Sequence, residues 1–210
     1  MIVDIWSDVV CPWCAIGMSR FEKALEATGV QATIRLHPFQ LDPEAPVPGV
    51  PARERYLAKF GEAAPAMLER VTNEAAEEGL AFDFGRALSA NTFDAHRAIA
   101  YARASGKDRD FEKRLFRAYF GEGLDVSDLA VLADLGAELG LDRAPLAAYL
   151  ESDRGVDELR GELVAAFDRG INAVPSFVFQ DEFVVPGAVD VSTFGRILEQ
   201  MRGLAAQDHP

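Results

Sequence analysis

The two cysteines of this chain, Cys11 and Cys14, stand one helical turn apart directly after an apolar segment. They are the only cysteines in 210 residues. A secreted scaffold held by disulfides uses more cysteines and spreads them out, and a four-thiolate zinc site needs a second pair. A single Cys-x-x-Cys beside an α/β pattern is typical of a redox site. The alternatives are two buried structural cysteines, or half of a zinc site shared between subunits.

The segment around this motif predicts a strand, a helix and a second strand. Residues 2–7 are short and β-rich. Pro12 is tolerated only in the first turn of a helix, and Gly29 is a suitable helix end. Residues 31–36 alternate between apolar and polar side chains. Strand, helix and strand in such a short stretch form a βαβ unit with a parallel pair.

The rest of the chain is a loop, a long helical block and a second β-containing segment. Five prolines between residues 38 and 51 predict a loop. The spacing of apolar residues then predicts helices over 52–60, 64–79, 91–105, 108–121, 127–140, 143–151 and 155–168, with an irregular stretch at 80–90. We expect Asn91 and Ser127 to act as helix caps. Two strands, 176–180 and 182–186, are predicted to join at Asp181, followed by a helix over 190–204 and a loose tail, 205–210.

This order predicts an α/β protein with a thioredoxin-like fold and a large all-helical insertion. Without the helical block, the remaining pieces make a four-stranded sheet with helices against it. We therefore expect residues 1–50 plus 169–210 to form a discontinuous thioredoxin-like domain. Residues 51–168 are expected to form a helical insertion domain.

The position of the cysteines favours thiol–disulfide exchange. A helix N-terminus supplies unpaired N–H groups and a partial positive charge, which stabilise a thiolate at Cys11. We expect Cys11 to be exposed and to attack a disulfide. Cys14, one turn into the helix, is expected to be less exposed and to resolve the mixed disulfide.

A second element, Val174-Pro175, precedes the apolar strand. Proline can begin a strand but cannot pair inside one. A cis bond there would leave the Val174 backbone free to pair with an extended peptide, whereas the alternative is an ordinary trans proline at a strand start.

The motif lies in a longer run that resembles the FrnE-like branch of the DsbA oxidoreductase family: Trp6-Ser7-Asp8-Val9-Val10-Cys11-Pro12-Trp13-Cys14, then Ile16-Gly17. Three further segments resemble it in order: Asn91-Thr92 with Ala95-His96-Arg97, Arg117-Ala118-Tyr119-Phe120 with Gly123, and Val174-Pro175-Ser176-Phe177-Val178. The resemblance implies a thioredoxin fold with a helical insertion, a cis Pro175, and oxidoreductase or isomerase activity. The chain departs from the family pattern at Ala15, at Asn172-Ala173 and after Pro186.

Several polar residues are candidates for supporting roles. Asp4 and Asp8 precede Cys11, and either could accept a proton from the buried cysteine. Asp8 also fits a capping or loop role. His96 is either a satisfied core histidine or, as the resemblance implies, a groove residue with Asn91. Pro12 and Trp13 would form substrate surface, or Trp13 would only pack over the motif.

Charge and composition exclude several classes of partner. The chain holds 21 Lys and Arg against 34 Asp and Glu, a net charge of −13. Nucleic-acid binding needs clustered basic residues, and a membrane span needs a long apolar run, so we expect neither partner. No basic region precedes an apolar segment at the start, which favours a cytoplasmic location. Three scattered histidines and two vicinal cysteines predict no metal site.

The sequence therefore predicts a protein disulfide oxidoreductase or isomerase acting on protein or small-molecule disulfides. We expect no tightly bound cofactor beyond the redox-active disulfide, with glutathione as a candidate thiol donor. The first rival is a glutathione-dependent isomerase or transferase of the kappa-like type. The second is a chaperone or binding module on the same fold. The sequence leaves the choice between monomer and homodimer open.

Overall fold

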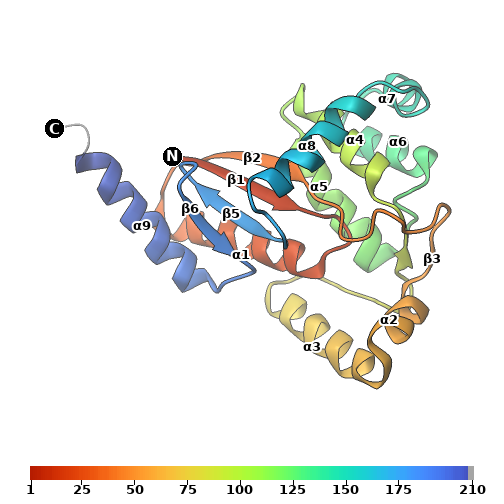
Figure 1. Cartoon of the computed structure of the whole chain (residues 1–210), viewed down its shortest axis with the longest axis horizontal. Helices are drawn as coiled ribbons and strands as arrows, with labels where there is room; N and C mark the ends of the chain where they lie inside the picture. Colours follow the sequence, from red (N-terminus) through yellow and green to blue (C-terminus); the bar gives the residue numbers. More distant parts are fainter. Residues whose placement is uncertain (208–210) are drawn as a thin grey trace.

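A four-stranded mixed sheet lies at the centre of the computed structural model, which describes residues 1–207 (Figure 1). The strands are β1 (Ile2–Ser7), β2 (Thr33–Pro38), β5 (Ser176–Phe179) and β6 (Phe183–Pro186). Their order is β2-β1-β5-β6, with β1 parallel to β2 and the other two pairs antiparallel. The predicted thioredoxin-like α/β fold is confirmed.

Three residues, 180–182, connect the paired Phe179 and Phe183 of the β5–β6 hairpin, and a 3.0 Å hydrogen bond from the N–H of Glu182 to the carbonyl oxygen of Phe179 closes a β-turn there. Gln180 and Asp181 have φ angles of 54° and 61°. Positive φ at both central residues gives the turn whose twist matches that of the flanking strands. The Gln180 side chain also accepts a 2.7 Å hydrogen bond from the backbone N–H of Ile2, so the turn is tied to β1.

Helices cover both faces of this sheet (Figure 1). On one face, α1 (Pro12–Thr28) packs against α9 (Val191–Gln207), and α8 (Val156–Asp168) covers β2 on the other. Phe21, Phe177 and Phe194 form the centre of the first interface, with ring centroids 4.7 to 5.3 Å apart. Burying three aromatic rings in mutual contact anchors the motif-bearing helix to the sheet.

The segment between β2 and β5 is mostly helical. Besides α8, its helices are α2 (Ala52–Phe60), α3 (Ala64–Glu77), α4 (Phe93–Arg103), α5 (Asp108–Phe116), α6 (Leu129–Glu138) and α7 (Arg143–Leu150). A 3-10 turn, Gly61–Ala63, separates α2 from α3, and β3 (Val50–Pro51) pairs with β4 (Leu88–Ser89). Apolar residues of α5 belong to the same buried cluster as those of β1 and α1, so the core is continuous. None of the described helices is long and apolar enough to cross a membrane.

The predicted helix over 108–121 is wrong in its second half. α5 ends at Phe116, and a π-helical turn, η2 (Arg117–Glu122), follows it. The wider turn puts both Tyr119 and Phe120 in the core. Gly123 ends this segment with a φ of 69°, and a Cβ there would lie 2.5 Å from the carbonyl oxygen of Arg86.

Two helix N-caps and the C-terminal end of the last helix also differ from the prediction. The N-cap of α4 is Thr92, although the Asn91 side chain accepts a hydrogen bond from the N–H of Phe93 at 2.9 Å. The N-cap of α6 is Asp128, whose carboxylate accepts from two backbone N–H groups, whereas Ser127 bonds to Asp125. The last helix continues to Gln207, and residues 208–210 of the predicted loose tail lie outside the described residues.

Candidate functional site

Cys11 is the N-cap of α1, and Pro12 occupies the first helical position. The backbone of Cys11 is extended, with φ −89° and ψ 110°. Its carbonyl accepts a hydrogen bond from the N–H of Cys14 at 3.0 Å. No side chain in the first turn of this helix is acidic. No acidic side chain within this turn therefore offsets the positive end of the helix at Cys11.

Both cysteines are free thiols and both are buried. The expectation of an exposed Cys11 is wrong, because only 4% of this residue is accessible and Cys14 is fully covered. Burial raises the pKa of the Cys14 thiol well above its usual value, and the neighbouring Cys11 raises it further. Cys14 therefore stays protonated until a base removes its proton.

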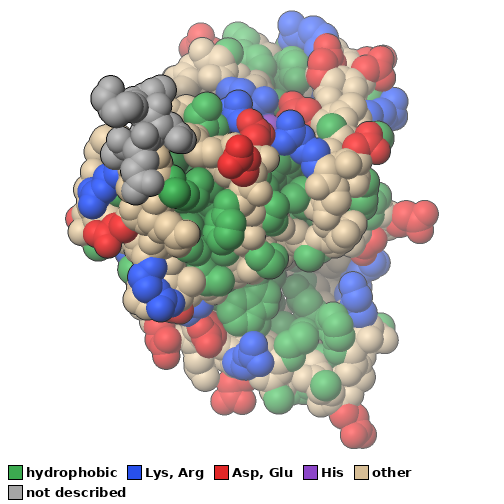
Figure 2. Space-filling model, turned by 60° about the vertical axis from the view of Figure 1, so that its left-hand side comes forward, with side chains coloured by type: hydrophobic (Ala, Val, Ile, Leu, Met, Phe, Trp, Pro, Cys, Tyr) green, Lys and Arg blue, Asp and Glu red, His purple; other side chains and the backbone are tan. Residues whose placement is uncertain are grey.

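A cavity of about 740 Å³ opens beside Cys11. Its walls come from the start of α1, the proline-rich loop, α2 and α3, and include Pro12, Trp13, Val174, Tyr56, Phe60 and Val71. Figure 2 shows apolar side chains gathered in a hollow near the middle of the molecule. The part below this hollow is formed by α2 and α3 (Figure 1). Cys11 is thus reached through an apolar cavity rather than directly from the surface.

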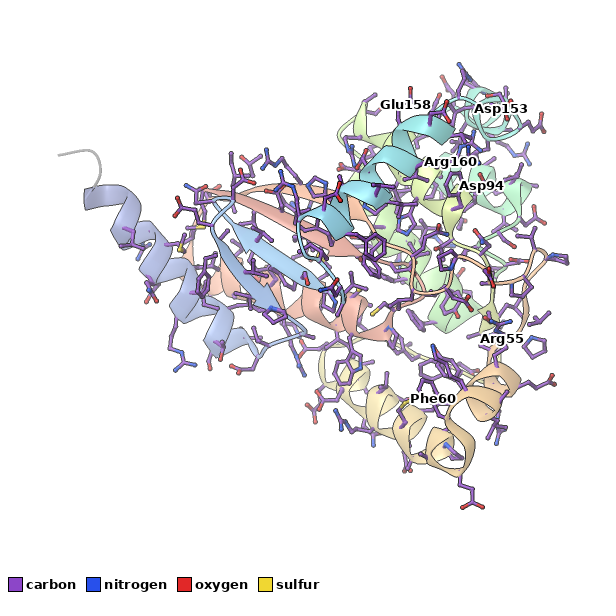
Figure 3. All side chains as sticks on the ribbon, in the orientation of Figure 1. Arg55, Phe60, Asp94, Asp153, Glu158 and Arg160 are labelled. Atoms are coloured by element: carbon purple, nitrogen blue, oxygen red, sulfur yellow. The ribbon has the colours of Figure 1, made fainter. Side chains whose placement is uncertain are left out.

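Two cationic side chains, Arg55 and Lys59, stand among these apolar walls, and a third, Arg70, lies just outside them. Arg55, which Figure 3 labels with Phe60 on α2, pairs with Asp42 at 2.6 Å. The ammonium of Lys59 lies 5.5 Å from the ring of Phe60. The guanidinium of Arg70 lies 5.6 Å from the ring of Trp13, which is half-buried beside Cys11. In a chain of net charge −13, this local positive charge favours an anionic ligand.

Val174 and Pro175, in the segment just before β5, lie against the motif. The Val174–Pro175 peptide bond is cis. The Sγ atom of Cys11 lies 3.6 Å from the carbonyl oxygen of Val174, which can accept a hydrogen bond from the thiol. Val174 lines the cavity, whereas Pro175 is buried against Gly17 of α1.

Asp8, His96 and Asn91 lie behind this cavity rather than in its walls. Asp8 accepts a 2.8 Å hydrogen bond from the N–H of Leu41, and its other oxygen lies 3.3 Å from Nε2 of His96. The same Nε2 lies 3.0 Å from the carbonyl oxygen of Phe39, which can only accept, so this nitrogen carries the hydrogen. These contacts hold the proline-rich loop in place.

Asn91 also ties down this loop. Its side chain donates to the carbonyl oxygen of Pro43 at 2.8 Å, and its backbone N–H donates to that of Pro46. Asn91 and His96 therefore position the wall of the cavity from outside.

Asp4 points to the other face of the sheet. It shares that face with Trp6, whereas Val3 and Ile5 belong to the cluster that contains Cys14. Burial opposes its ionisation, but hydrogen bonds from Arg35 and His37 outweigh burial, so the pKa of Asp4 is lowered. The structure does not bring Asp4 to Cys14.

The sequence analysis missed functional candidates in the helical segment. Burial, with nearby Cys11 and Asp8, raises the pKa of Tyr56 in the cavity wall to about 12, so its hydroxyl stays a hydrogen-bond donor. Glu112 is also fully buried, in α5. The sequence did indicate that Glu112 is unusual, because it is the acidic residue between the apolar positions Phe111 and Leu115 of one helix.

Among residues 1–207, no group of three or more His, Cys, Asp or Glu side chains could hold a metal ion.

The chain is similar to proteins of one fold family over nearly its whole length. Residues 2–199 match the model of the DSBA-like thioredoxin domain. A crystal structure of a probable DsbA oxidoreductase from Streptomyces coelicolor is 33% identical, with a TM-score of 0.90 over 97% of this chain and 90% of that one. The cytosolic disulfide reductase DsbM from Pseudomonas aeruginosa, also determined with GSH, is 21% identical, with a TM-score of 0.66 over 99% of this chain and 98% of that one.

Two curated proteins are also similar. The uncharacterized protein YwbO of Bacillus subtilis is 28% identical over 199 residues, 93% of this chain and 94% of YwbO. The 2-hydroxychromene-2-carboxylate isomerase of Sphingobium xenophagum is 22% identical over 183 residues, 86% of this chain and 89% of the isomerase.

Proposed function

The chain belongs to the DSBA-like thioredoxin domain family, and we propose that it is a thiol–disulfide oxidoreductase working by dithiol–disulfide exchange. The observation that carries the proposal is the pair of free thiols at the N-terminus of α1, with Cys11 at the wall of an apolar cavity. A helix N-terminus stabilises the thiolate that exchange requires. Membership of the FrnE-like branch stays a prediction.

The proposed reaction has two displacements. The Cys11 thiolate attacks a sulfur of the substrate disulfide, the S–S bond breaks, and the released thiolate takes up a proton. Cys14 then loses its proton and attacks Sγ of Cys11, which forms the Cys11–Cys14 disulfide and releases the second substrate thiol. The substrate gains an electron pair and the enzyme loses one.

We propose that the protein works in the cytoplasm and that its net reaction there is the reduction of substrate disulfides. A reducing compartment keeps the Cys11–Cys14 pair in the dithiol form. Glutathione, itself oxidised to its disulfide, is the proposed donor that restores the pair. Lys59 in the cavity wall and Arg70, which lies over the ring of Trp13 just outside the wall, support this choice, because glutathione carries carboxylates. The likeness to DsbM, determined with GSH, supports it too.

We also propose that residues 51–168 are an insertion domain whose role is to shape the substrate cavity. The side chains that face Cys11 across the cavity, among them Tyr56 and Phe60, come from this segment. Removing it would leave Cys11 open to solvent on that side.

A glutathione-dependent isomerase is the second candidate. It is favoured by the apolar cavity beside Cys11, which has room for an aromatic ring, and by the similarity to the Sphingobium isomerase. An isomerase would need no second thiol, so the presence of Cys14 favours the oxidoreductase.

Reduction of insulin disulfides separates these candidates. With glutathione as donor, the wild type is expected to precipitate the insulin B chain, whereas Cys11→Ser is expected to lose the activity. An isomerase would leave insulin intact and convert 2-hydroxychromene-2-carboxylate instead. A wild type without insulin reduction, with glutathione or with a dithiol donor, would refute the proposal.

A further inference from the structure

The second displacement needs a base for Cys14, and neither aspartate near the motif is free to act as one. Asp4 lies on the far face of the sheet with Arg35 and His37. Asp8 is engaged with the N–H of Leu41 and lies beside His96. The proton of a fully buried thiol must still leave before its sulfur can attack.

Glu112 offers a carboxyl group on the inner side of the motif. It projects from α5 into the core and is only 2% exposed. Ser7, at the end of β1, is 1% exposed and lies on the same face of this strand as Val3 and Ile5, which pack in one buried cluster with Cys14 and with residues of α5. Its hydroxyl lowers the pKa of both Cys14 and Glu112. Within the described chain, neither Ser7 Oγ nor Glu112 Oε2 has a hydrogen-bond partner. Ser7 is therefore buried on the Cys14 side of the sheet and is not committed to another partner.

The electrostatic surroundings suit Glu112 to exchange a proton near neutral pH. Burial raises its pKa to about 7. The Ser7 hydroxyl and His96 oppose this rise, and the carboxylates of Asp108 and Glu22 add to it. A base whose pKa lies near the working pH transfers protons efficiently in both directions.

A small cavity links Glu112 to the opposite surface. Its lining includes Glu112 and His96 inside, and His37, Arg103 and Glu162 outside. The outer three side chains are 29% to 44% exposed. The cavity volume of about 10 Å³ is close to that needed for one water molecule with polar partners. This cavity, lined in part by polar side chains, offers a proton held by Glu112 a route to solvent that avoids the substrate cavity.

We propose that Glu112 takes the proton of Cys14 through the Ser7 hydroxyl and returns it to solvent through this small cavity. The inference rests on the proposed function. In the mixed disulfide, the Sγ–H bond of Cys14 breaks, Ser7 passes a proton to the Glu112 carboxylate, and the new thiolate attacks Sγ of Cys11. The Cys11–substrate S–S bond breaks, and the leaving thiolate is protonated by water. Glu112 acts through Ser7 and is therefore a positioning residue.

Stopped-flow reaction of the reduced enzyme with one equivalent of 4,4′-dithiodipyridine separates the two displacements. Attack by Cys11 releases a first thiopyridone, and attack by Cys14 releases a second. The Cys14→Ser variant gives the first phase alone and so identifies it. In the wild type, the rate of the second phase is expected to rise with pH and to level off above about pH 7 to 8.

Glu112→Gln is expected to leave the first phase unchanged and to slow the second at least about tenfold at pH 8, without levelling near pH 7. Ser7→Ala is expected to slow the same phase, and Glu112→Asp to restore part of the pH profile. Glu69→Gln, the same change at an exposed position of α3, is the matched control and is expected to react as the wild type does.

Other outcomes would overturn the inference. A second phase in Glu112→Gln with the wild-type rate and pH profile would show that Cys14 uses another base. Equal slowing of both phases would assign Glu112 a purely structural role. A wild type that releases neither thiopyridone would contradict the proposed function itself, and this inference with it.

Discussion

The thiol sulfur of Cys11 lies 3.6 Å from the carbonyl oxygen of Val174, a residue 163 positions further along the chain. The sheet creates this contact, because β5 pairs with β1 so that Ser176 lies opposite Trp6. Val174 and the loop before Cys11 lie just beyond these paired residues, so they meet at the end of the sheet. A substrate disulfide that reaches Cys11 must therefore pass the Val174 backbone.

The approach of α1 to Pro175 depends on Gly17. A Cβ at this position would lie 3.1 Å from Cγ of Pro175 and 3.3 Å from Cβ of Ala188. Gly17→Ala is expected to push Pro175, and with it Val174, away from Cys11. We predict a roughly threefold to tenfold loss of kcat/KM in insulin reduction, because small displacements of reacting groups cost rate.

Gly203→Ala is the control for this change. Gly203 lies in α9 with open space around its Cα, so alanine is expected to stabilise the helix by about 0.5–1 kcal/mol and to leave activity unchanged. Full activity in Gly17→Ala would contradict the importance of this contact.

Arg97 joins α4 to the end of α7 and to the connection between α7 and α8. Its guanidinium is buried and donates to the carbonyl oxygens of Tyr149, Leu150 and Arg154 at 2.7 to 3.0 Å, besides pairing with Asp94. Arg97→Met would leave these acceptors buried without a donor. We predict a loss of roughly 3 kcal/mol in the free energy of unfolding, measured by urea titration.

Arg160→Met tests whether this loss is specific. The side chain of Arg160 is 68% exposed, and its guanidinium lies 3.6 Å from the carboxylate of Asp157. Figure 3 labels both Arg160 and Asp94. We expect its replacement to change the free energy of unfolding by less than about 0.5 kcal/mol. A similar small effect in Arg97→Met would show that the buried arginine contributes little to stability.

Glu112 should also make stability depend on pH. Its pKa is near 4.5 in the unfolded chain and about 7 in the folded one, so the folded state binds the proton more tightly. The stability contributed by the protonated form is fully present below about pH 4.5 and is lost as the pH rises through about 7. Glu112→Gln removes this loss.

Urea titrations at several pH values check this expectation. The variant is expected to match the wild type near about pH 4 and to exceed it by roughly 3 kcal/mol at about pH 9. A difference that does not change with pH would show that Glu112 keeps an ordinary pKa in the folded protein.

Local patterns were sufficient to predict most elements. Strands and helices each have a characteristic spacing of apolar residues along the sequence. For this reason β1, α2 and α8 lie close to the predicted ranges. The π-helical turn after Phe116 was missed because its apolar residues fit an ordinary helix equally well. The caps shifted by one residue, because neighbouring Asn, Thr, Ser and Asp can each satisfy free N–H groups.

The surroundings of the cysteines could not be predicted in the same way. Local sequence places Cys11 at a helix start, where exposure is the natural expectation. Its burial depends on Val174 and on Tyr56, which reach it from distant segments. The position of Glu112 behind Ser7 is likewise a tertiary relationship, so the sequence suggested Asp4 and Asp8, which are near Cys11 along the chain.

The proposed exchange requires Cys11 to make the covalent bond to substrate and Cys14 to release it. The intact mass of the Cys14→Ser variant after incubation with oxidised glutathione tests this division of roles. We predict an adduct of one glutathionyl group, located on Cys11 by peptide mapping and absent from Cys11→Ser. A Cys14→Ser protein that stays unmodified, or one that carries its adduct elsewhere, would show that Cys11 is not the attacking thiol.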